Sequence, residues 1–127
     1  MQRNVINSAE APAAAGGYSQ SVEVVGAKRL LFVSGQIPEE IDGSIPPTFA
    51  EQARLAWRNV EAQLKQAGMS FDNLVKVTTI VTDRQYVKEN RLIRNAALGQ
   101  QQPASTLLIA GIYDERWLIE IEATAAG

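Results

Sequence analysis

The chain has 127 residues, 46% of them hydrophobic, which is enough for one domain with a buried core and too short for two comfortable domains. Its 12 basic and 14 acidic residues give a net charge of −2 without a basic stripe, so a nucleic-acid backbone is not the expected partner. The absence of cysteine and histidine excludes disulfides, thiolate nucleophiles, imidazole bases and metal sites built on either residue.

The sequence limits the residues that could act in catalysis and indicates where in the cell the protein is found. Acid–base catalysis would have to use carboxylates, lysine, tyrosine, hydroxyls or bound water. Residues 1–17 lack the apolar core of a signal peptide, and no apolar run approaches the roughly 20 residues of a membrane span. We therefore expect a soluble, cytoplasmic protein with no membrane partner.

The first third of the chain predicts two strands. Residues 1–17 contain a proline and a glycine pair, and we expect them to be irregular. The alternation of SVEVV at 21–25 and the β-branched, apolar run RLLFVSGQI at 29–37 are both typical of strands. The turn residues at 26–27 predict that these strands form a hairpin, and the Pro, Asp and Gly content of 38–47 predicts a loop.

The clearest helix follows this loop. Thr48 and Glu51 match a capping box, in which each side chain satisfies a free backbone N–H of the first turn. Gly68 predicts the end of the helix. Apolar residues recur between these limits at spacings of three and four and form one stripe: Phe49, Ala53, Ala56, Trp57, Val60, Leu64 and Ala67.

The second half of the chain repeats the pattern. A β-branched strand at 74–83 precedes a helix at 85–99, and two strands at 105–112 and 117–125 end the chain. Their order, β-β-α-β-α-β-β, predicts an α+β sandwich of a single domain, 1–127, with two helices on one face of a mixed sheet. The inward residues expected in the second helix are Leu92, Ile93, Ala96 and Ala97.

The other face of the predicted sheet keeps apolar residues from LLFVSGQI and LLIAGI. An exposed apolar sheet face usually means that a partner covers it. We therefore expect the chain to form a homo-oligomer.

The motif IEIEA near the C-terminal end carries two candidate carboxylates. In a strand, Glu120 and Glu122 point to one face, and Ile119 and Ile121 point to the other. A carboxylate near a strand end can orient a water molecule or accept a proton. A solvated strand face is the alternative interpretation.

Three other motifs offer polar groups beside glycines or apolar strands. In FVSGQIP, Gly35 lets a ligand or another backbone come close and Ser34 offers a hydroxyl, although a β-bulge would explain both. In GGYSQS, Tyr18 supplies an amphipathic ring, and a packed loop tyrosine is the alternative. In PAST, Ser105 and Thr106 are two hydroxyls at the start of an apolar strand.

Together these motifs resemble the Rid (YjgF/YER/RidA) family, also labelled endoribonuclease L-PSP. The resemblance runs from Ala11 to Ala125 and rests on YSQSV, LLFVSGQIP and IEIEA in this order and spacing. It implies a chorismate-mutase-like sandwich in a homotrimer, with sheets lining a central barrel and small-molecule clefts between subunits. It also implies hydrolysis of enamines and imines derived from amino acids to ammonia and a 2-keto acid, with no cofactor and no metal.

The resemblance assigns roles to particular residues. The family's pocket tyrosine falls on Tyr18, its strand-end Ser–Gly on Ser34 and Gly35, and its water-orienting glutamate on Glu120. The arginine that binds the substrate carboxylate, from the family's P-A-R-S motif, falls on Ser105, because the motif here is PAST. The expected arginine is missing.

Two smaller departures from the family pattern accompany this loss. The usual G-P-Y-S-Q is GGYSQ here, so Gly17 loosens a loop that proline would stiffen. An asparagine of the family's second helix falls on Arg91, with Asn90 next to it.

Loss of the arginine changes the expected substrate. A guanidinium holds a carboxylate through two charge-assisted hydrogen bonds, whereas a serine offers one neutral donor. Removal of a buried charged partner costs on the order of 2–5 kcal/mol of binding, so we do not expect efficient deamination of the usual 2-imino acids. Two alternatives stay open. In the first, Arg91 or Arg94 supplies the positive charge of the missing arginine; the opposing interpretation is that both are solvated surface residues. In the second, the ligand carries an uncharged group in place of the carboxylate, and this group binds Ser105 and Thr106.

We therefore expect a Rid-like hydrolase or deaminase for an enamine, imine or related metabolite, with Glu120 and Tyr18 as catalytic residues. The alternatives are an enzyme of a different reaction type on the same fold and a non-catalytic metabolite binder. RNA cleavage or translation inhibition ranks last, because the chain has no basic stripe with stacking aromatics. The expected substrate-binding residues are Ser34, Gly35, Ser105, Thr106 and Arg91.

Overall fold

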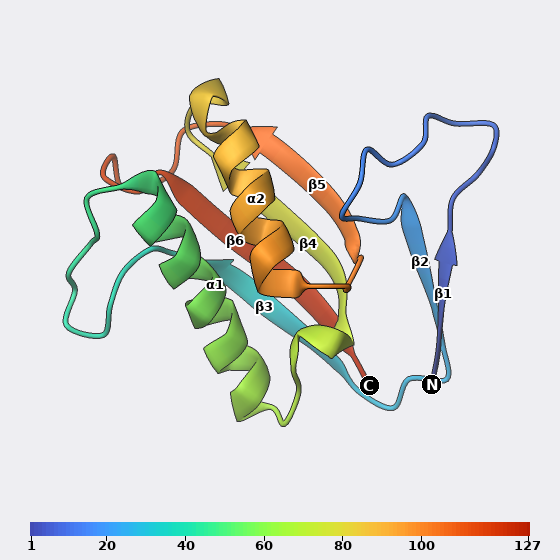
Figure 1. The fold of residues 1–127 in the computed structure, drawn as a ribbon. Coiled ribbons are helices and arrows are strands. Elements are labelled where there is room, and N and C mark those ends of the chain that lie inside the picture. The colour runs from blue at the N-terminus through green and yellow to red at the C-terminus, as the bar shows by residue number, and fades with distance from the viewer.

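The computed structural model describes all 127 residues, in eight strands and helices joined by loops and two short 3₁₀ turns (Figure 1). The two turns are Phe71–Asn73 and Arg84–Tyr86. The elements in chain order are β1 (Gln2–Ile6), β2 (Ser21–Val25), β3 (Leu30–Gln36), α1 (Phe49–Gln66), β4 (Leu74–Val81), α2 (Val87–Leu98), β5 (Ala104–Ile109) and β6 (Ile119–Ala126).

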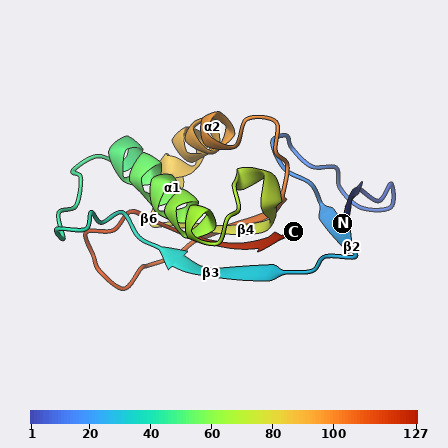
Figure 2. The ribbon, with the colours of Figure 1, turned by 90° about the horizontal axis from the view of Figure 1, so that it is seen from below.

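The main sheet has the strand order β3-β6-β4-β5. Strand β6 runs antiparallel to both β3 and β4, whereas β4 and β5 are parallel, so the sheet is mixed. Figures 1 and 2 show both helices on one face of this sheet. The predicted α+β sandwich with two helices on one face is confirmed.

The predicted hairpin of 21–25 with 29–37 is wrong. Strand β2 pairs with β1, inside the segment that we expected to be irregular, and β3 pairs with β6. The turn between β2 and β3 is a crossover between two sheets: Gly26 takes φ +73°, and the backbone N–H groups of Lys28 and Arg29 donate to the carbonyl of Gly127. The residues at 26–27 form a turn as predicted. The strands with which β2 and β3 pair, however, are determined by contacts between residues far apart in the sequence.

Helix α1 packs its apolar stripe on the sheet as predicted. Thr48 Oγ1 accepts a hydrogen bond from the Glu51 backbone N–H at 3.2 Å, which is the Thr48 half of the predicted capping box. Gly68, with φ +71°, follows the end of the helix. The core between helix and sheet includes Phe49, Ala53, Ala56, Trp57, Val60, Leu64, Val77, Val81, Ile119 and Ile121.

Helix α2 buries only part of the predicted face. Ile93 is buried and Ala97 packs against the core, but Leu92 is 63% exposed and Ala96 is also exposed. The reason is that Asn90, which is 4% exposed, occupies the inner face one turn before Ile93. The helix is therefore rotated away from the all-apolar arrangement that its sequence favours.

The second face of the sheet has no helix over it in this chain, and it is partly apolar. Phe32 on β3 is 75% exposed and Leu108 on β5 is 48% exposed. Both share this face with Glu120 and Glu122, because Phe32 pairs with Thr124, and Leu108 pairs with Ile80 opposite Glu120. We call it the open face. None of the helices is long and apolar enough to span a membrane.

Candidate functional site

A pocket of about 210 Å³ lies between α2, the start of β5 and the loop that leads into β2. The register explains its strand side: Ser105 and Leu107 pair with Val77 and Thr79 of β4, so their side chains face the helices. The lining residues are Ala15, Tyr18, Val87, Asn90, Arg91, Arg94, Ser105 and Leu107. We call it the helix-side pocket.

The YSQ segment closes one side of this pocket because Ser19 anchors it to the chain that enters β5. The Ser19 backbone N–H donates to the Pro103 carbonyl at 3.1 Å, and its hydroxyl donates to the Gln102 carbonyl. Ser19 is 1% exposed, and in Figure 1 the loop before β2 reaches the start of β5. This anchor holds Tyr18 in the pocket wall, where its hydroxyl oxygen accepts a hydrogen bond from the Ala15 N–H at 3.3 Å.

Arg94 is the most tightly held polar side chain of the pocket. Its Nη2 donates to the Gly16 carbonyl at 3.2 Å and to Asn95 Oδ1 at 3.1 Å, and its Nε donates to the same Oδ1. Its Cζ lies 5.8 Å from the centroid of the Tyr18 ring, within cation–π range. Burial lowers the pKa of Arg94, and the charge of the neighbouring Arg91 lowers it further.

Asn90 is the pocket residue that the sequence patterns left unassigned. Its side chain is almost fully buried, and its Oδ1 has no hydrogen-bond partner in the chain. A buried acceptor without a donor costs stability unless a ligand or a water molecule supplies one. The signal that could have found it is a polar residue inside the helical stripe, three positions before Ile93.

Glu120 lies on the open face, beside the bulge at Ser34 and Gly35. The register of β3 with β6 shifts between Val33 and Gln36, so the predicted alternative of a β-bulge is present together with the glutamate. A Cβ added at Gly35 would lie 2.7 Å from Glu120 Cδ. The glycine therefore leaves the space that the half-buried carboxylate occupies. Ser34 is exposed at the bulge.

Thr106 also lies on the open face, opposite to its neighbour Ser105. It pairs with Thr78, and its Oγ1 accepts a hydrogen bond from Lys76 Nζ at 2.7 Å. The structure thus divides the predicted site residues of one chain into two groups. Tyr18, Arg91 and Ser105 line the helix-side pocket, whereas Gly35, Thr106 and Glu120 lie on the open face.

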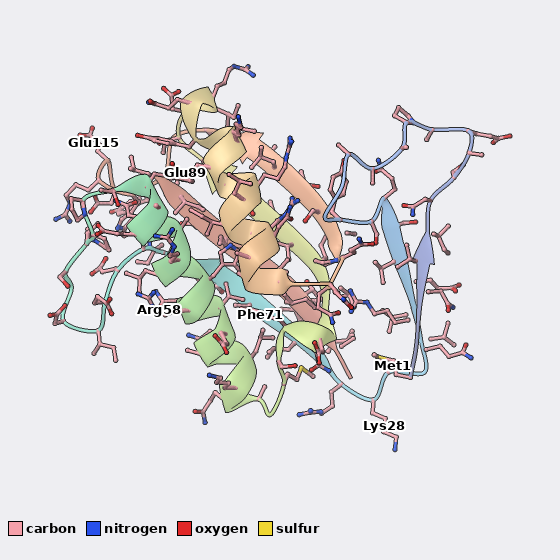
Figure 3. All side chains as sticks on the ribbon, in the orientation of Figure 1. Met1, Lys28, Arg58, Phe71, Glu89 and Glu115 are labelled. Atoms are coloured by element: carbon pink, nitrogen blue, oxygen red, sulfur yellow. The ribbon has the colours of Figure 1, made fainter.

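The other surfaces of the chain carry fewer polar groups that could take part in catalysis. A groove of about 460 Å³ between α1 and α2 is lined mainly by apolar side chains, among them Trp57, Leu92 and Phe71. Of these three residues, Figure 3 labels Phe71. No group of three or more Asp or Glu residues that could hold a metal ion occurs in the chain.

Comparison with known proteins adds an independent finding. The sequence model of the family described as Endoribonuclease L-PSP matches residues 8–127. A 2-iminobutanoate/2-iminopropanoate deaminase of Rattus norvegicus is 35% identical over 126 residues, which cover 97% of this chain and 89% of the relative.

Solved structures show the same fold over the whole chain. YyfB of the conserved Rid protein family from Yersinia pestis is similar with a TM-score of 0.85 and 25% identity, and the match covers 100% of both chains. TdcF of E. coli, solved with bound serine, is similar with a TM-score of 0.72 and 30% identity over 98% of both chains. The predicted YjgF-like fold is confirmed.

Proposed function

From the fact that this chain belongs to the endoribonuclease L-PSP family, which includes the Rid proteins, we propose that it is a small-molecule deaminase that hydrolyses an enamine or imine. The observation that carries the proposal is the set of polar groups in the helix-side pocket, in a chain similar along nearly its whole length to an imine deaminase. An enamine first tautomerises to the imine, as a proton moves from its nitrogen to its carbon. Water then adds to the carbon of the C=N bond, the C–N bond breaks, and the nitrogen leaves as ammonia, so that a carbonyl compound remains.

Glu120 and Tyr18 are the proposed catalytic residues. Glu120 would orient the attacking water and accept its proton, which is general-base catalysis by a carboxylate. The Tyr18 oxygen already accepts a hydrogen bond from the Ala15 N–H, so its own O–H is free to donate to the substrate or leaving nitrogen. Asn90 Oδ1, without a partner in the chain, would accept a hydrogen bond from the substrate nitrogen.

The remaining proposed substrate-binding groups are divided between the two faces. Ser105 and Arg91 would bind substrate in the helix-side pocket. Ser34 and Gly35 would bind it beside Glu120 on the open face, and Thr106 would bind it farther along that face, in register with Glu122. Since Ser105 offers one neutral donor in place of the family's arginine, we propose that the substrate differs from the usual 2-imino acids.

A second copy of the chain would unite these groups. The open face exposes Phe32 and Leu108, and β5 is an edge strand whose outer side pairs with no strand of the main sheet. We propose a homotrimer in which Glu120 of one chain meets the helix-side pocket of its neighbour. The trimer number comes from the resemblance to the family, and the exposed apolar residues and the divided site support an assembly of some kind.

The test is ammonia release from freshly generated 2-aminoacrylate and a panel of related enamines and imines. We expect the wild type to turn over at least one compound of the panel, and 2-aminoacrylate less efficiently than that compound, because 2-aminoacrylate yields a usual 2-imino acid. For the best substrate we expect a loss of about 100-fold or more in Glu120→Gln, and no loss in Glu122→Gln, which changes the next carboxylate on the same face. Metabolite binding without ammonia release would favour a non-catalytic binder. RNA cleavage that survives Glu120→Ala would indicate contamination of the preparation.

A further inference from the structure

Two positive charges line the helix-side pocket without an acidic partner. Arg91 and Arg94 both contribute to its wall. Neither takes part in an ion pair, since the three ion pairs of the chain involve other residues. Within α2, the positions three and four residues away, where an acidic partner on the same helix would lie, include no Asp or Glu, and Lys88 adds a further positive charge one turn before Arg91.

Arg94 is held in place while one nitrogen of its guanidinium stays free to donate. Its hydrogen bonds to Gly16 and Asn95 use Nε and Nη2, which leaves both N–H groups of Nη1 without a partner in the chain. The Tyr18 ring supports its guanidinium from one side. A side chain held in this way loses little conformational entropy when a ligand binds, which favours affinity.

Gly17 is the residue that makes room for this arrangement. It takes φ +74°, and a Cβ at this position would lie 2.6 Å from Arg94 Nη2. The family's loop has a proline at this position. The φ angle of proline is fixed at about −65°, so proline could not take the conformation of Gly17. Two departures from the family pattern, Gly17 for proline and Ser105 for arginine, thus border the same pocket as Arg94.

We propose that the helix-side pocket binds a small molecule with two carboxylates, one held by Arg94 and the other by Arg91. Resting on the proposed deaminase function, this names the substrate class as an imine or enamine of a dicarboxylic acid. A dianion neutralises both guanidinium groups, whereas a monoanion leaves one of two neighbouring cations unpaired. The Ser105 hydroxyl donates to a carboxylate oxygen, and Asn90 Oδ1 accepts from the substrate nitrogen. The pocket, at about 210 Å³, holds a small ligand of this kind.

Calorimetric titration of the purified, assembled protein at low ionic strength tests the binding part without any need for turnover. The probes are succinate, propionate and inorganic phosphate. We expect succinate to bind at least about tenfold more tightly than propionate, since one more charge-assisted contact forms. Arg91→Gln should remove most of this preference, and Arg84→Gln, an exposed arginine outside the pocket, should keep it.

Arg94 needs a paired test because its side chain also holds the N-terminal loop. Arg94→Lys keeps the positive charge but loses the two-pronged guanidinium, and Arg94→Gln loses both. The affinity for succinate should therefore decrease from the wild type to Arg94→Lys and decrease further in Arg94→Gln, while the affinity for propionate decreases less. Equal binding of succinate and propionate, or a succinate affinity unchanged in Arg91→Gln, would overturn the proposal. Phosphate binding without succinate binding would overturn the dicarboxylate assignment.

Activity separates this proposal from the deaminase function. If 2-aminoacrylate, a monocarboxylate, is turned over better than 2-iminosuccinate generated in the assay, the deaminase function stands and the dicarboxylate class fails. If neither compound is turned over but succinate binding depends on Arg91, the dianion site stands and the deaminase function fails.

Discussion

Ser105 and Glu120 lie on opposite faces of one sheet. Ser105 pairs with Val77 of β4 and faces the helices, while Glu120 pairs with Ile80 of β4 and faces away from them. A ligand held at Ser105 cannot reach Glu120 of the same chain without passing through the sheet. Catalysis that uses both residues therefore requires a cleft shared by two chains, and the first two predictions follow from this geometry.

The open face should be the contact surface between chains. Phe32→Glu places a charge on it, and we expect the oligomer to dissociate and ammonia release to fall with it, because the charge would have to be buried at the interface. Light scattering should give a mass near three chains for the wild type and near one for the variant. The matched control is Leu92→Glu, because Leu92 is also a largely exposed apolar residue but lies on the helix side. This variant should leave the mass unchanged. A monomeric wild type would contradict the shared cleft.

A mixing experiment should show that the two groups of residues act in different chains. Glu120→Gln and Asn90→Ala chains are each expected to be nearly inactive alone. When they are unfolded together and refolded at equal amounts, about one quarter of the clefts should combine an intact glutamate with an intact pocket, if chains assemble at random around a closed ring. Recovery of about that fraction of ammonia release supports the shared cleft. No recovery, with a normal oligomer mass, would place both residues in one chain's cleft.

Local periodicity predicted most of the fold and the face of the sheet on which Glu120 lies. The alternation of IEIEA placed Glu120 and Glu122 on one face, and the stripe of α1 is buried as expected. In α2 the same reasoning was correct for Ile93 and Ala97 and wrong for Leu92 and Ala96, because Asn90 takes an inner position at the pocket that an apolar residue would otherwise fill. A pattern of hydrophobicity alone cannot distinguish a buried polar residue from a surface residue.

The other missed features depend on contacts between distant parts of the chain. The division between Ser105 and Glu120 depends on the register of β4 with both β5 and β6. The position of Arg94 depends on its bond to the Gly16 carbonyl, 78 residues away in sequence. No local motif carries such information, which is why Arg94 could be read equally well as a solvated helix residue.

Gly17 should matter for stability through its backbone conformation. Gly17→Ala forces a side chain into the left-handed region at φ +74° beside the Arg94 guanidinium, and we expect a loss of about 1–2 kcal/mol in the free energy of unfolding. Urea unfolding followed by circular dichroism measures it. Gly111→Ala is the control, because Gly111 has no positive φ and no atom near its added Cβ, and its effect should be a few tenths of a kcal/mol. Equal effects of the two substitutions would show that the loop relaxes freely around Arg94.

Gly35→Ala should act on catalysis rather than on the backbone. Gly35 has no positive φ, so alanine introduces no left-handed strain, but its Cβ would lie 2.7 Å from Glu120 Cδ and would push the carboxylate away. Because a base must stay within hydrogen-bond reach of its proton, we expect kcat to fall by about tenfold or more, while unfolding in urea changes little. Gly111→Ala again provides the control and should keep full activity. If Gly35→Ala leaves kcat unchanged in an assembly of normal mass, then Glu120 does not need its present position, and its role as the base is wrong.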